Sequence, residues 1–351
     1  MPSPHRKPIC VNTKILNYRI TGAQRYLLEI LKRFPADGFR SIAPPTWSSG
    51  MKGHLWEQAV LPLRKGRGSL LWSPSITGPL AVADQVVTIF DIAPLDHPEW
   101  FRSGFSGYYS YVVPRIARRA KRIIAISEYT KERIVAICGV PPEKVEVTLL
   151  AADARFSPTA ADPARVAALG LPTARYLLAL GSIEPRKNVP ALIRAWGRVQ
   201  DRIPADISLV LAGGSGRASI FGSVDLEPLP PRVHFTGHVA DEALPALLAG
   251  ATGFCYPSIY EGFGLPPLEA MASGVPVITR NLTSLPEVVG DAGLLVDPHS
   301  VDSIAEALLR LGTDDGLRAG LSAKGLERNR RFSWDVAAAR TWDILCAEAA
   351  C

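Results

Sequence analysis

The sequence predicts an α/β protein made of two doubly wound units with mostly parallel strands. Short apolar runs alternate with amphipathic segments, which is the pattern of strands and helices in βαβ order. The chain has 351 residues, and this length suggests two domains at roughly 150 residues each. Residues 151–173 are rich in Ala, Pro and Asp and lack periodicity, so we expect a linker there.

Five apolar runs in the first half predict strands, and two segments there have helical spacing. A helix is expected to begin at Gly22, because apolar residues from Tyr26 to Phe34 recur on one helical face. Ser127 is placed to cap a second helix over 128–137. The predicted strands of this half are 9–12, 70–73, 85–90, 122–126 and 145–149.

The alternation restarts after the linker and continues to the end of the chain. Ligands bind beyond the carboxyl ends of the strands in such sheets, so two facing sheets would hold a two-part ligand in a cleft between them. The predicted strands are 176–180, 207–212, 233–236, 253–256, 275–279 and 294–296, and the predicted helices are 189–199, 266–273, 301–311 and 333–349.

Composition excludes several classes of protein. Five cysteines form no CxxC pair and six histidines form no HExxH motif, so neither a zinc site nor a disulfide framework is indicated. The apolar runs are too short to cross a bilayer and the first residues lack a signal-peptide pattern, so we expect a cytoplasmic protein.

The net charge of +6 is unevenly distributed along the chain. Residues 1–160 hold 22 Lys and Arg against 12 Asp and Glu, and residues 161–351 hold 17 against 21. A half this basic favours an anionic partner surface, although a merely solubilising surface is the alternative. Aromatic residues and arginines interleave over 100–122, which suits either an interfacial helix on anionic lipid or a helix with its aromatic face in the core.

The most informative segment is 256–274, YPSIYEGFGLPPLEAMASG. Gly262 and Gly264 flank Phe263 and allow a tight turn, and Pro266 and Pro267 suit the first turn of a helix. This loop would deliver backbone N–H groups and a helix N-terminus to one spot, which is a site for a diphosphate.

Two carboxylates and two cations complete this candidate site. Glu261 and Glu269 lie on either side of the loop, and carboxylates accept paired hydrogen bonds from vicinal hydroxyls of sugars. Arg186 and Lys187 follow a predicted strand in GSIEPRKN, where they can neutralise a departing diphosphate. Helix capping for Glu269 and a solvated basic turn for the cations are the alternatives.

A third segment, TGAQRY at 21–26, offers a capping Thr21 and a Gly22 that lets the chain pass close to phosphate oxygens. These segments, in this order, resemble the GT-B retaining glycosyltransferases of family 4 over nearly the full chain. The resemblance also covers VVTIFDIAPLDHPEWF, RRAKRIIAISEYTKERI, LALGSIEPRKNVPALIRAW and FSWDVAAARTW.

The resemblance implies two Rossmann-like domains facing across a cleft. The N-terminal, acceptor-side domain would cover 1–165 together with a C-terminal helix at 333–351 that crosses back to it. The nucleotide-sugar donor domain would cover 170–331.

The resemblance also implies roles for individual residues. Arg186 and Lys187 would bind the donor diphosphate, Glu261 the sugar hydroxyls and Glu269 the ribose, while Gly22 would contact the diphosphate from the other domain. The backbone of Phe263, Gly264 and Leu265 would lie beside sugar and phosphate, and residues 234–237 near the base.

One position departs from the family pattern. Similar enzymes usually have His-Asp where this chain has Phe90 and Asp91, and that histidine lies near O6 of the donor sugar in several members. An apolar ring there favours a 6-deoxy sugar, although Phe90 packing at a strand end is an equal alternative. Discrimination of one methyl-sized group is worth roughly 1–3 kcal/mol.

The resemblance implies transfer of a hexose or 6-deoxyhexose (mannose-, rhamnose- or fucose-like) with retention. No second carboxylate offers itself as a nucleophile, so same-face substitution is favoured over a covalent intermediate. The cations would replace a metal, and no cofactor is expected. The expected acceptor is a lipid-linked saccharide of surface polysaccharide assembly at an anionic membrane, and no nucleic-acid partner is expected. A non-catalytic nucleotide-sugar-binding scaffold is the alternative.

Overall fold

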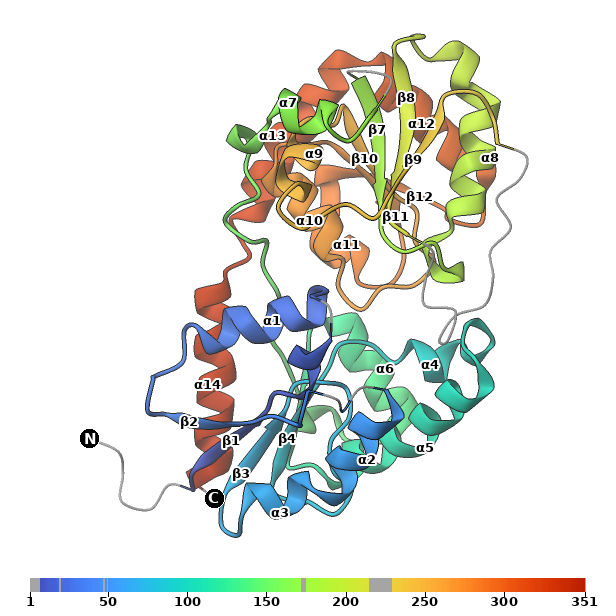
Figure 1. Ribbon diagram of the computed structural model, residues 1–351. Coiled ribbons are helices and arrows are strands. Elements are labelled where there is room, and N and C mark those ends of the chain that lie inside the picture. Colours follow the sequence, from blue (N-terminus) through green and yellow to red (C-terminus); the bar gives the residue numbers. More distant parts are fainter. Residues whose placement is uncertain are drawn as a thin grey trace. The chain divides into compact units, whose positions relative to one another are not determined.

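The computed structural model describes residues 7–18, 20–46, 48, 50–171, 175–214 and 229–350. These residues form two compact units (Figure 1). The first unit comprises the chain up to Pro98, Ser103–Leu150 and the chain from Ser333 onward. The second comprises Glu99–Arg102 and Ala151–Phe332.

The first unit is built on a six-stranded parallel sheet in the order β2-β1-β3-β4-β5-β6. Strands buried on both faces read as continuous apolar runs, which is why most of them could be predicted. β2 was not predicted, because two of its four residues are exposed at the edge of the sheet. The strands are β1 (Ile9–Asn12), β2 (Phe39–Ile42), β3 (Leu70–Ser73), β4 (Gln85–Ile89), β5 (Arg122–Ala125) and β6 (Val145–Val147).

Helices of this unit connect the strands and cover the sheet. Ser127 caps α6 by accepting a hydrogen bond from the Thr130 backbone N–H, as the sequence predicts. The helices are η1 (Lys14–Asn17), α1 (Gly22–Leu31), α2 (Met51–Ala59), α3 (Leu61–Lys65), α4 (Ala93–Asp96), α5 (Ser103–Arg119), α6 (Glu128–Cys138), η3 (Pro142–Lys144) and α14 (Trp334–Ala350).

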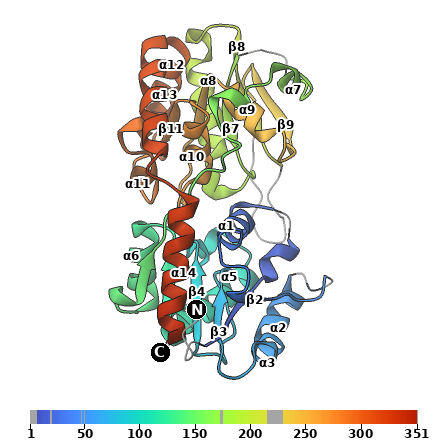
Figure 2. The ribbon, with the colours of Figure 1, turned by 90° about the vertical axis from the view of Figure 1, so that its left-hand side faces the viewer.

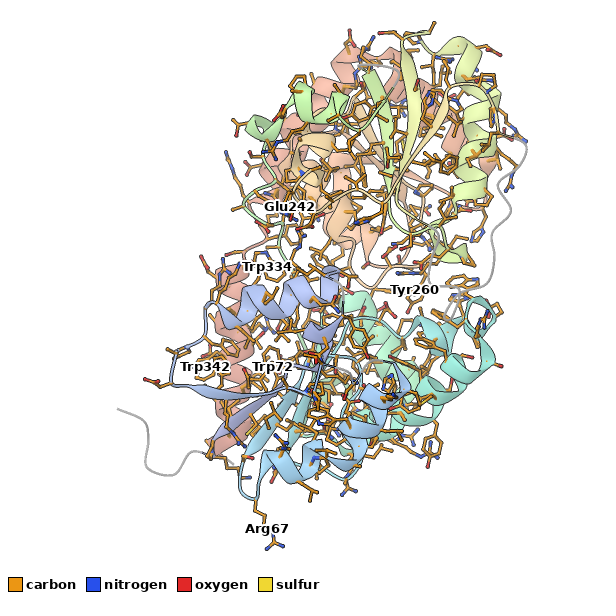
Figure 3. The ribbon with its side chains drawn as sticks, in the orientation of Figure 1. Arg67, Trp72, Glu242, Tyr260, Trp334 and Trp342 are labelled. Carbon is orange, nitrogen blue, oxygen red and sulfur yellow. The ribbon has the colours of Figure 1, made fainter. Side chains whose placement is uncertain are left out.

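The last helix, α14, packs against α1 and β3 of the first unit (Figure 2). The Trp342 ring packs at a tilt of 57° against the Phe34 ring, 4.7 Å between ring centroids, and Figure 3 labels Trp342 and Trp72 in this unit. A Cβ at Gly38 would lie 2.5 Å from the Trp342 ring. The predicted return of the C-terminal helix to the first unit is therefore confirmed.

The second unit holds another six-stranded parallel sheet, in the order β12-β11-β10-β7-β8-β9. Counted from β7, this is the 3-2-1-4-5-6 order of a doubly wound dinucleotide-binding fold. The strands are β7 (Arg175–Leu180), β8 (Ile207–Ala212), β9 (Val233–Gly237), β10 (Gly253–Tyr256), β11 (Val277–Arg280) and β12 (Gly293–Val296). The predicted α/β class with two doubly wound units is confirmed.

Four α-helices of this unit were not predicted from the sequence: α7, the short α9 and α11, and α13. α7 lies inside the expected linker, where Asp162 caps it by accepting from the backbone N–H groups of Ala164 and Arg165. α13 contains three glycines, which weaken its helical signal. The helices are η4 (Pro158–Ala160), α7 (Pro163–Ala167), η5 (Pro185–Lys187), α8 (Val189–Val199), η6 (Gln200–Arg202), α9 (Leu244–Ala249), α10 (Leu265–Ala272), α11 (Leu285–Val289), η7 (Gly290–Ala292), α12 (Val301–Thr313) and α13 (Asp315–Asn329).

A buried ion pair joins the loop after β1 to α2 in the first unit. Nζ of Lys14 lies 2.8 Å from Oε2 of Glu57, and the two side chains are 4% and 0% exposed. Asn12 and Thr77 also donate to the Glu57 carboxylate, at 2.9 and 2.7 Å. Burial by itself would raise the pKa of Glu57, but the charge of Lys14 and the hydrogen bonds from His54 and Lys14 lower it to about 2. The stabilisation is therefore present at neutral pH and is lost as pH falls toward about 2.

Replacing Glu57 with Ala is expected to lower the free energy of unfolding of the first unit by about 3–5 kcal/mol. The reason is that Lys14 would stay buried without a counter-charge. Urea unfolding followed by tryptophan fluorescence measures the change.

Two variants serve as controls for this experiment. Glu132→Ala removes an exposed carboxylate of the same unit and should change the free energy by less than about 0.5 kcal/mol. Lys14→Met combined with Glu57→Leu removes both charges and should recover most of the loss. An unchanged midpoint for Glu57→Ala would contradict the role given to the pair.

Candidate active site

Two loops meet at the carboxyl edge of the second sheet. β7 pairs with β8 on one side and with β10 on the other, so the strand order reverses between β7 and β10. Ligands of doubly wound sheets bind at such a switch point. The loops after these two strands carry GSIEPRKN and the segment around Glu261, so the topology brings the predicted cations and carboxylate together.

Hydrogen bonds join the two loops along their backbones. The backbone N–H of Ile259 donates to the carbonyl of Arg186 at 2.6 Å, and Oγ of Ser258 lies 2.9 Å from the same carbonyl oxygen. Asn188, in a left-handed conformation with φ of 58°, donates from its amide to the carbonyl of Pro257 at 3.2 Å. These contacts fix the turn that presents Arg186 and Lys187.

Glu261 is the centre of the charged cluster. Nζ of Lys187 donates to its Oε1 at 2.7 Å, and the hydroxyls of Tyr256 and Ser258 donate to the same oxygen at 2.9 and 2.6 Å. NH1 of Arg186 lies 3.5 Å from Oε2. Burial alone would raise the pKa of Glu261, but Lys187 and Arg186 lower it to about 2. Glu261 is therefore ionised throughout the physiological range.

A second buried carboxylate balances the second cation. Nε of Arg186 donates to Glu184 at 2.5 Å, and Glu184 is 2% exposed. Lys187 also donates to the Tyr256 hydroxyl at 2.5 Å and lies over the Tyr256 ring. Burial lowers the pKa of Lys187 from its usual value, against the opposing charge of Glu261. Two cations and two carboxylates thus share one desolvated cluster.

The GFG loop ends at the N-terminus of α10. Gly264 has φ of 109°, and a Cβ there would lie 2.5 Å from the Leu285 side chain, so only glycine fits. The helix begins at Leu265, one residue before the predicted start. The Phe263 ring is buried and packs edge-on against Phe332 at 5.8 Å. Phe263 can therefore face a ligand only through its backbone.

Glu269 lies one turn into α10 and is 7% exposed. Its charge contributes to raising the pKa of Arg155, whose guanidinium also donates to the Asp241 carboxylate at 2.8 Å. Glu269 is therefore held in a charged environment rather than acting as an exposed helix-capping residue.

A hollow adjoins Lys187 at the ends of β7, β8 and β10. Gly181 and Gly213, with φ of 143° and 144°, lie in close backbone contact in the lining of this hollow. A Cβ at Gly213 would lie 2.0 Å from the carbonyl oxygen of Gly181, so this contact requires glycine. The hollow is mainly apolar apart from Lys187, Ser182 and the Tyr256 hydroxyl. Its lining is Ala179, Leu180, Gly181, Ser182, Ile183, Lys187, Val189, Leu192, Leu211, Ala212, Gly213, Cys255, Tyr256 and Pro257.

The remaining predicted site residues belong to the first unit. Gly22 is the first residue of α1, and Thr21 before it donates from its backbone N–H to Oε1 of Gln24 at 2.9 Å. Phe90 follows β4 and packs edge-on against Tyr26 at 5.3 Å. Asp91 accepts from the backbone N–H of Ala93 at 3.0 Å. Tyr26 therefore links the first turns of α1 to Phe90 within this unit.

Three site residues were not anticipated from the sequence. Tyr256 reads as the apolar end of a strand, yet its hydroxyl bridges Lys187 and Glu261. Ser258 follows in the same loop, and the Ser284 hydroxyl lies 3.0 and 2.8 Å from the carbonyl oxygens of Glu261 and Phe263. No motif marks Ser284, which is distant in sequence. Within the described residues, no three His, Cys, Asp or Glu side chains are grouped as metal ligands.

Comparisons with known proteins agree with this arrangement. Residues 69–154 match the family described as Glycosyltransferase Family 4, and residues 165–328 match Glycosyl transferases group 1. The O-antigen chain mannosyltransferase B of Escherichia coli is 34% identical over 289 residues, which span 80% of this chain and 74% of that protein. The serotype-specific mannosyltransferase WbdA of Escherichia coli is 30% identical over 259 residues, 71% of this chain but 32% of WbdA.

The fold also matches a solved structure. Anabaena HepE, in complex with UDP-glucose, superposes with a TM-score of 0.73 at 19% identity, covering 98% of this chain and 100% of HepE. The two sheets, the strand order and the sequence matches lead to one conclusion: the chain belongs to the GT-B glycosyltransferases of family 4, the glycosyl transferases group 1.

Proposed function

We propose that this protein transfers a mannose-like hexose from a nucleotide-sugar donor to a lipid-linked saccharide in surface polysaccharide assembly, with retention of configuration. The observation that carries the proposal is the cluster of Arg186, Lys187 and Glu261 at the switch point, beside the N-terminus of α10. The sugar class is supported by the O-antigen mannosyltransferase, and the nucleotide donor by HepE with UDP-glucose.

Each group of the cluster has a part in this proposal. Arg186, Lys187 and the backbone N–H of Leu265 would bind the donor diphosphate, because cations and a helix N-terminus favour negative charge. Glu261 would accept hydrogen bonds from the sugar hydroxyls, and Glu269 from the ribose hydroxyls.

The proposed step is a same-face substitution at the anomeric carbon. The bond from that carbon to the acceptor oxygen forms on the face from which the bond to the diphosphate oxygen breaks. The acceptor proton passes to the departing diphosphate oxygen. The protein contributes orientation and charge, because Arg186 and Lys187 stabilise the negative charge that develops on the leaving group.

Glu261→Gln is expected to lower kcat/KM for transfer by at least about 100-fold, because a neutral amide accepts weaker hydrogen bonds than a carboxylate. Initial rates with a mannose nucleotide donor measure the effect. Glu306→Gln, which changes an exposed carboxylate on α12 of the same unit, is the matched control and should keep the wild-type rate. Equal rates for both variants would reject a role for Glu261.

Since the pKa of Glu261 is about 2, no inflection of the wild-type pH profile above pH ~4 should come from this group.

Transfer is expected to continue in excess EDTA, because Arg186 and Lys187 supply the positive charge that a divalent ion provides in other transferases. The assay compares initial rates with EDTA and with added Mg²⁺ or Mn²⁺. Strict dependence of the rate on a divalent ion would contradict the role given to the two cations.

The donor preference is expected to depend on Phe90. If its ring faces the 6-position of the sugar, Phe90→His should change the ratio between the kcat/KM for a 6-deoxyhexose donor and the kcat/KM for the hexose donor. The expected change is roughly tenfold in favour of the hexose donor. The packing of Phe90 on Tyr26 is the competing explanation. An unchanged ratio, with a lower melting temperature, would assign Phe90 to packing alone.

A further inference from the structure

Two short helices of the first unit expose large apolar side chains at helical spacing. Met51 and Leu55 on α2 are both 62% exposed, and Leu63 on α3 is 81% exposed. Met51 and Leu55 are four residues apart and lie on one face of α2. Ala59, four residues further on, is also exposed. This stripe is not part of the core clusters of the unit.

The opposite face of α2 fixes the rotation of the helix. Trp56 is buried in the core cluster, and Glu57 is fully buried in its ion pair with Lys14. A rotation that buried Met51 and Leu55 would move the Glu57 carboxylate out of its hydrogen bonds with Asn12 and Thr77. The outward position of the stripe is therefore enforced by the interior of the unit.

Basic residues of the same segment are exposed, and exposed acidic residues are missing from it. Lys52, Arg64 and Arg67 are exposed, and Figure 3 shows Arg67 extending away from the unit at the turn after α3. Glu57 is the only Asp or Glu between Asp37 and Asp84, and it is buried. The exposed charge contributed by this segment is thus positive.

α5 continues this surface on the neighbouring side. The His54 ring of α2 lies 4.5 Å from the Tyr108 ring, so the two helices adjoin. Tyr108 and Tyr109 pack against the core, which agrees for these two residues with the alternative of an aromatic face in the core. Tyr111 is instead 55% exposed, with the Arg115 guanidinium 3.6 Å from its ring centroid.

The outer side of α5 is also basic. Arg118 and Arg119 are exposed on it, and the sequence from 100 to 127 contains no Asp or Glu. We define the basic-apolar face as Met51, Lys52, Leu55, Leu63, Arg64, Arg67, Tyr111, Arg115, Arg118 and Arg119.

We propose that the basic-apolar face docks on an anionic lipid bilayer. Met51, Leu55 and Leu63 would enter the boundary between headgroups and acyl chains, and the lysine and arginines would contact lipid phosphates. Amphipathic helices with basic polar faces bind bilayers in this way, roughly 5–10 Å deep. An acidic protein partner would satisfy the basic residues but would not require exposed methionine and leucine beside them. The proposal deepens the proposed function, since a lipid-linked acceptor is reached at such a surface, but lipid binding is measurable without any substrate.

The test is flotation of the full chain with vesicles, without donor or acceptor. One set contains phosphatidylcholine alone and the other equal parts of phosphatidylcholine and phosphatidylglycerol. The wild type should bind only the anionic vesicles, and less tightly at high salt. Met51→Ser/Leu55→Ser/Leu63→Ser should bind at least about tenfold more weakly. Lys52→Glu/Arg64→Glu/Arg67→Glu should weaken binding by roughly fivefold or more per residue.

Matched controls come from exposed residues of the second unit. Leu282→Ser/Leu295→Ser removes exposed apolar side chains, and Arg194→Glu/Arg310→Glu/Arg330→Glu makes the same change of charge at other exposed sites. Both should bind vesicles like the wild type. Thermal unfolding of every variant checks that it is folded.

Three results would overturn the proposal. These are no binding of the wild type to anionic vesicles, unchanged binding of the serine variant, or equal losses in the control variants. Donor turnover is measured separately with a detergent-solubilised acceptor, where the serine variant should match the wild type. A wild type that turns over donor but does not bind anionic vesicles would overturn this inference alone, and a wild type that binds vesicles but does not turn over donor would overturn the proposed function alone.

Discussion

A buried lysine–glutamate pair lies at the point where the strand order of each sheet reverses. In the second unit, the pair of Lys187 and Glu261 joins the loops after β7 and β10 at 2.7 Å. In the first unit, the pair of Lys14 and Glu57 joins the loop after β1 to α2 at 2.8 Å. Lys14 and Glu57 also both contact Thr77 in the loop after β3, the strand on the other side of β1 from β2. Desolvating two charges costs several kcal/mol per ion, so each pair depends on the hydrogen bonds around it.

The two pairs differ in how fully they are enclosed. The Glu57 side chain is 0% exposed and accepts from Lys14, Asn12 and Thr77, which leaves little capacity for a ligand. The side chains of Lys187 and Glu261 are 13% and 9% exposed, and Lys187 also lines a hollow. The first pair therefore acts as a structural element. The second can exchange partners, since a diphosphate would compete with Glu261 for the ammonium group of Lys187.

The sequence predicted what depends on local pattern. Buried parallel strands such as β3 and β8 appear as uninterrupted apolar runs, and their observed bounds agree with the predicted ones. The edge strand β2 and the glycine-containing helix α13 lack such patterns. In the site, Arg186, Lys187 and Glu261 were found by motif and spacing. The hydroxyls of Tyr256 and Ser284 were not, because their partners are set by tertiary packing rather than by neighbours in sequence.

The position of α14 has a consequence for how the chain is made. Asp335 near its start pairs with Arg33 at 2.5 Å, and Glu348 near its end pairs with Arg122 at 2.9 Å. During synthesis, the amino-terminal sheet therefore emerges from the ribosome long before the helix that covers Trp72 and Phe34 has been translated. Until then, part of the apolar surface of the first sheet remains exposed to water while the second sheet is synthesised. This is the interval in which a chaperone would shield the largest exposed apolar surface.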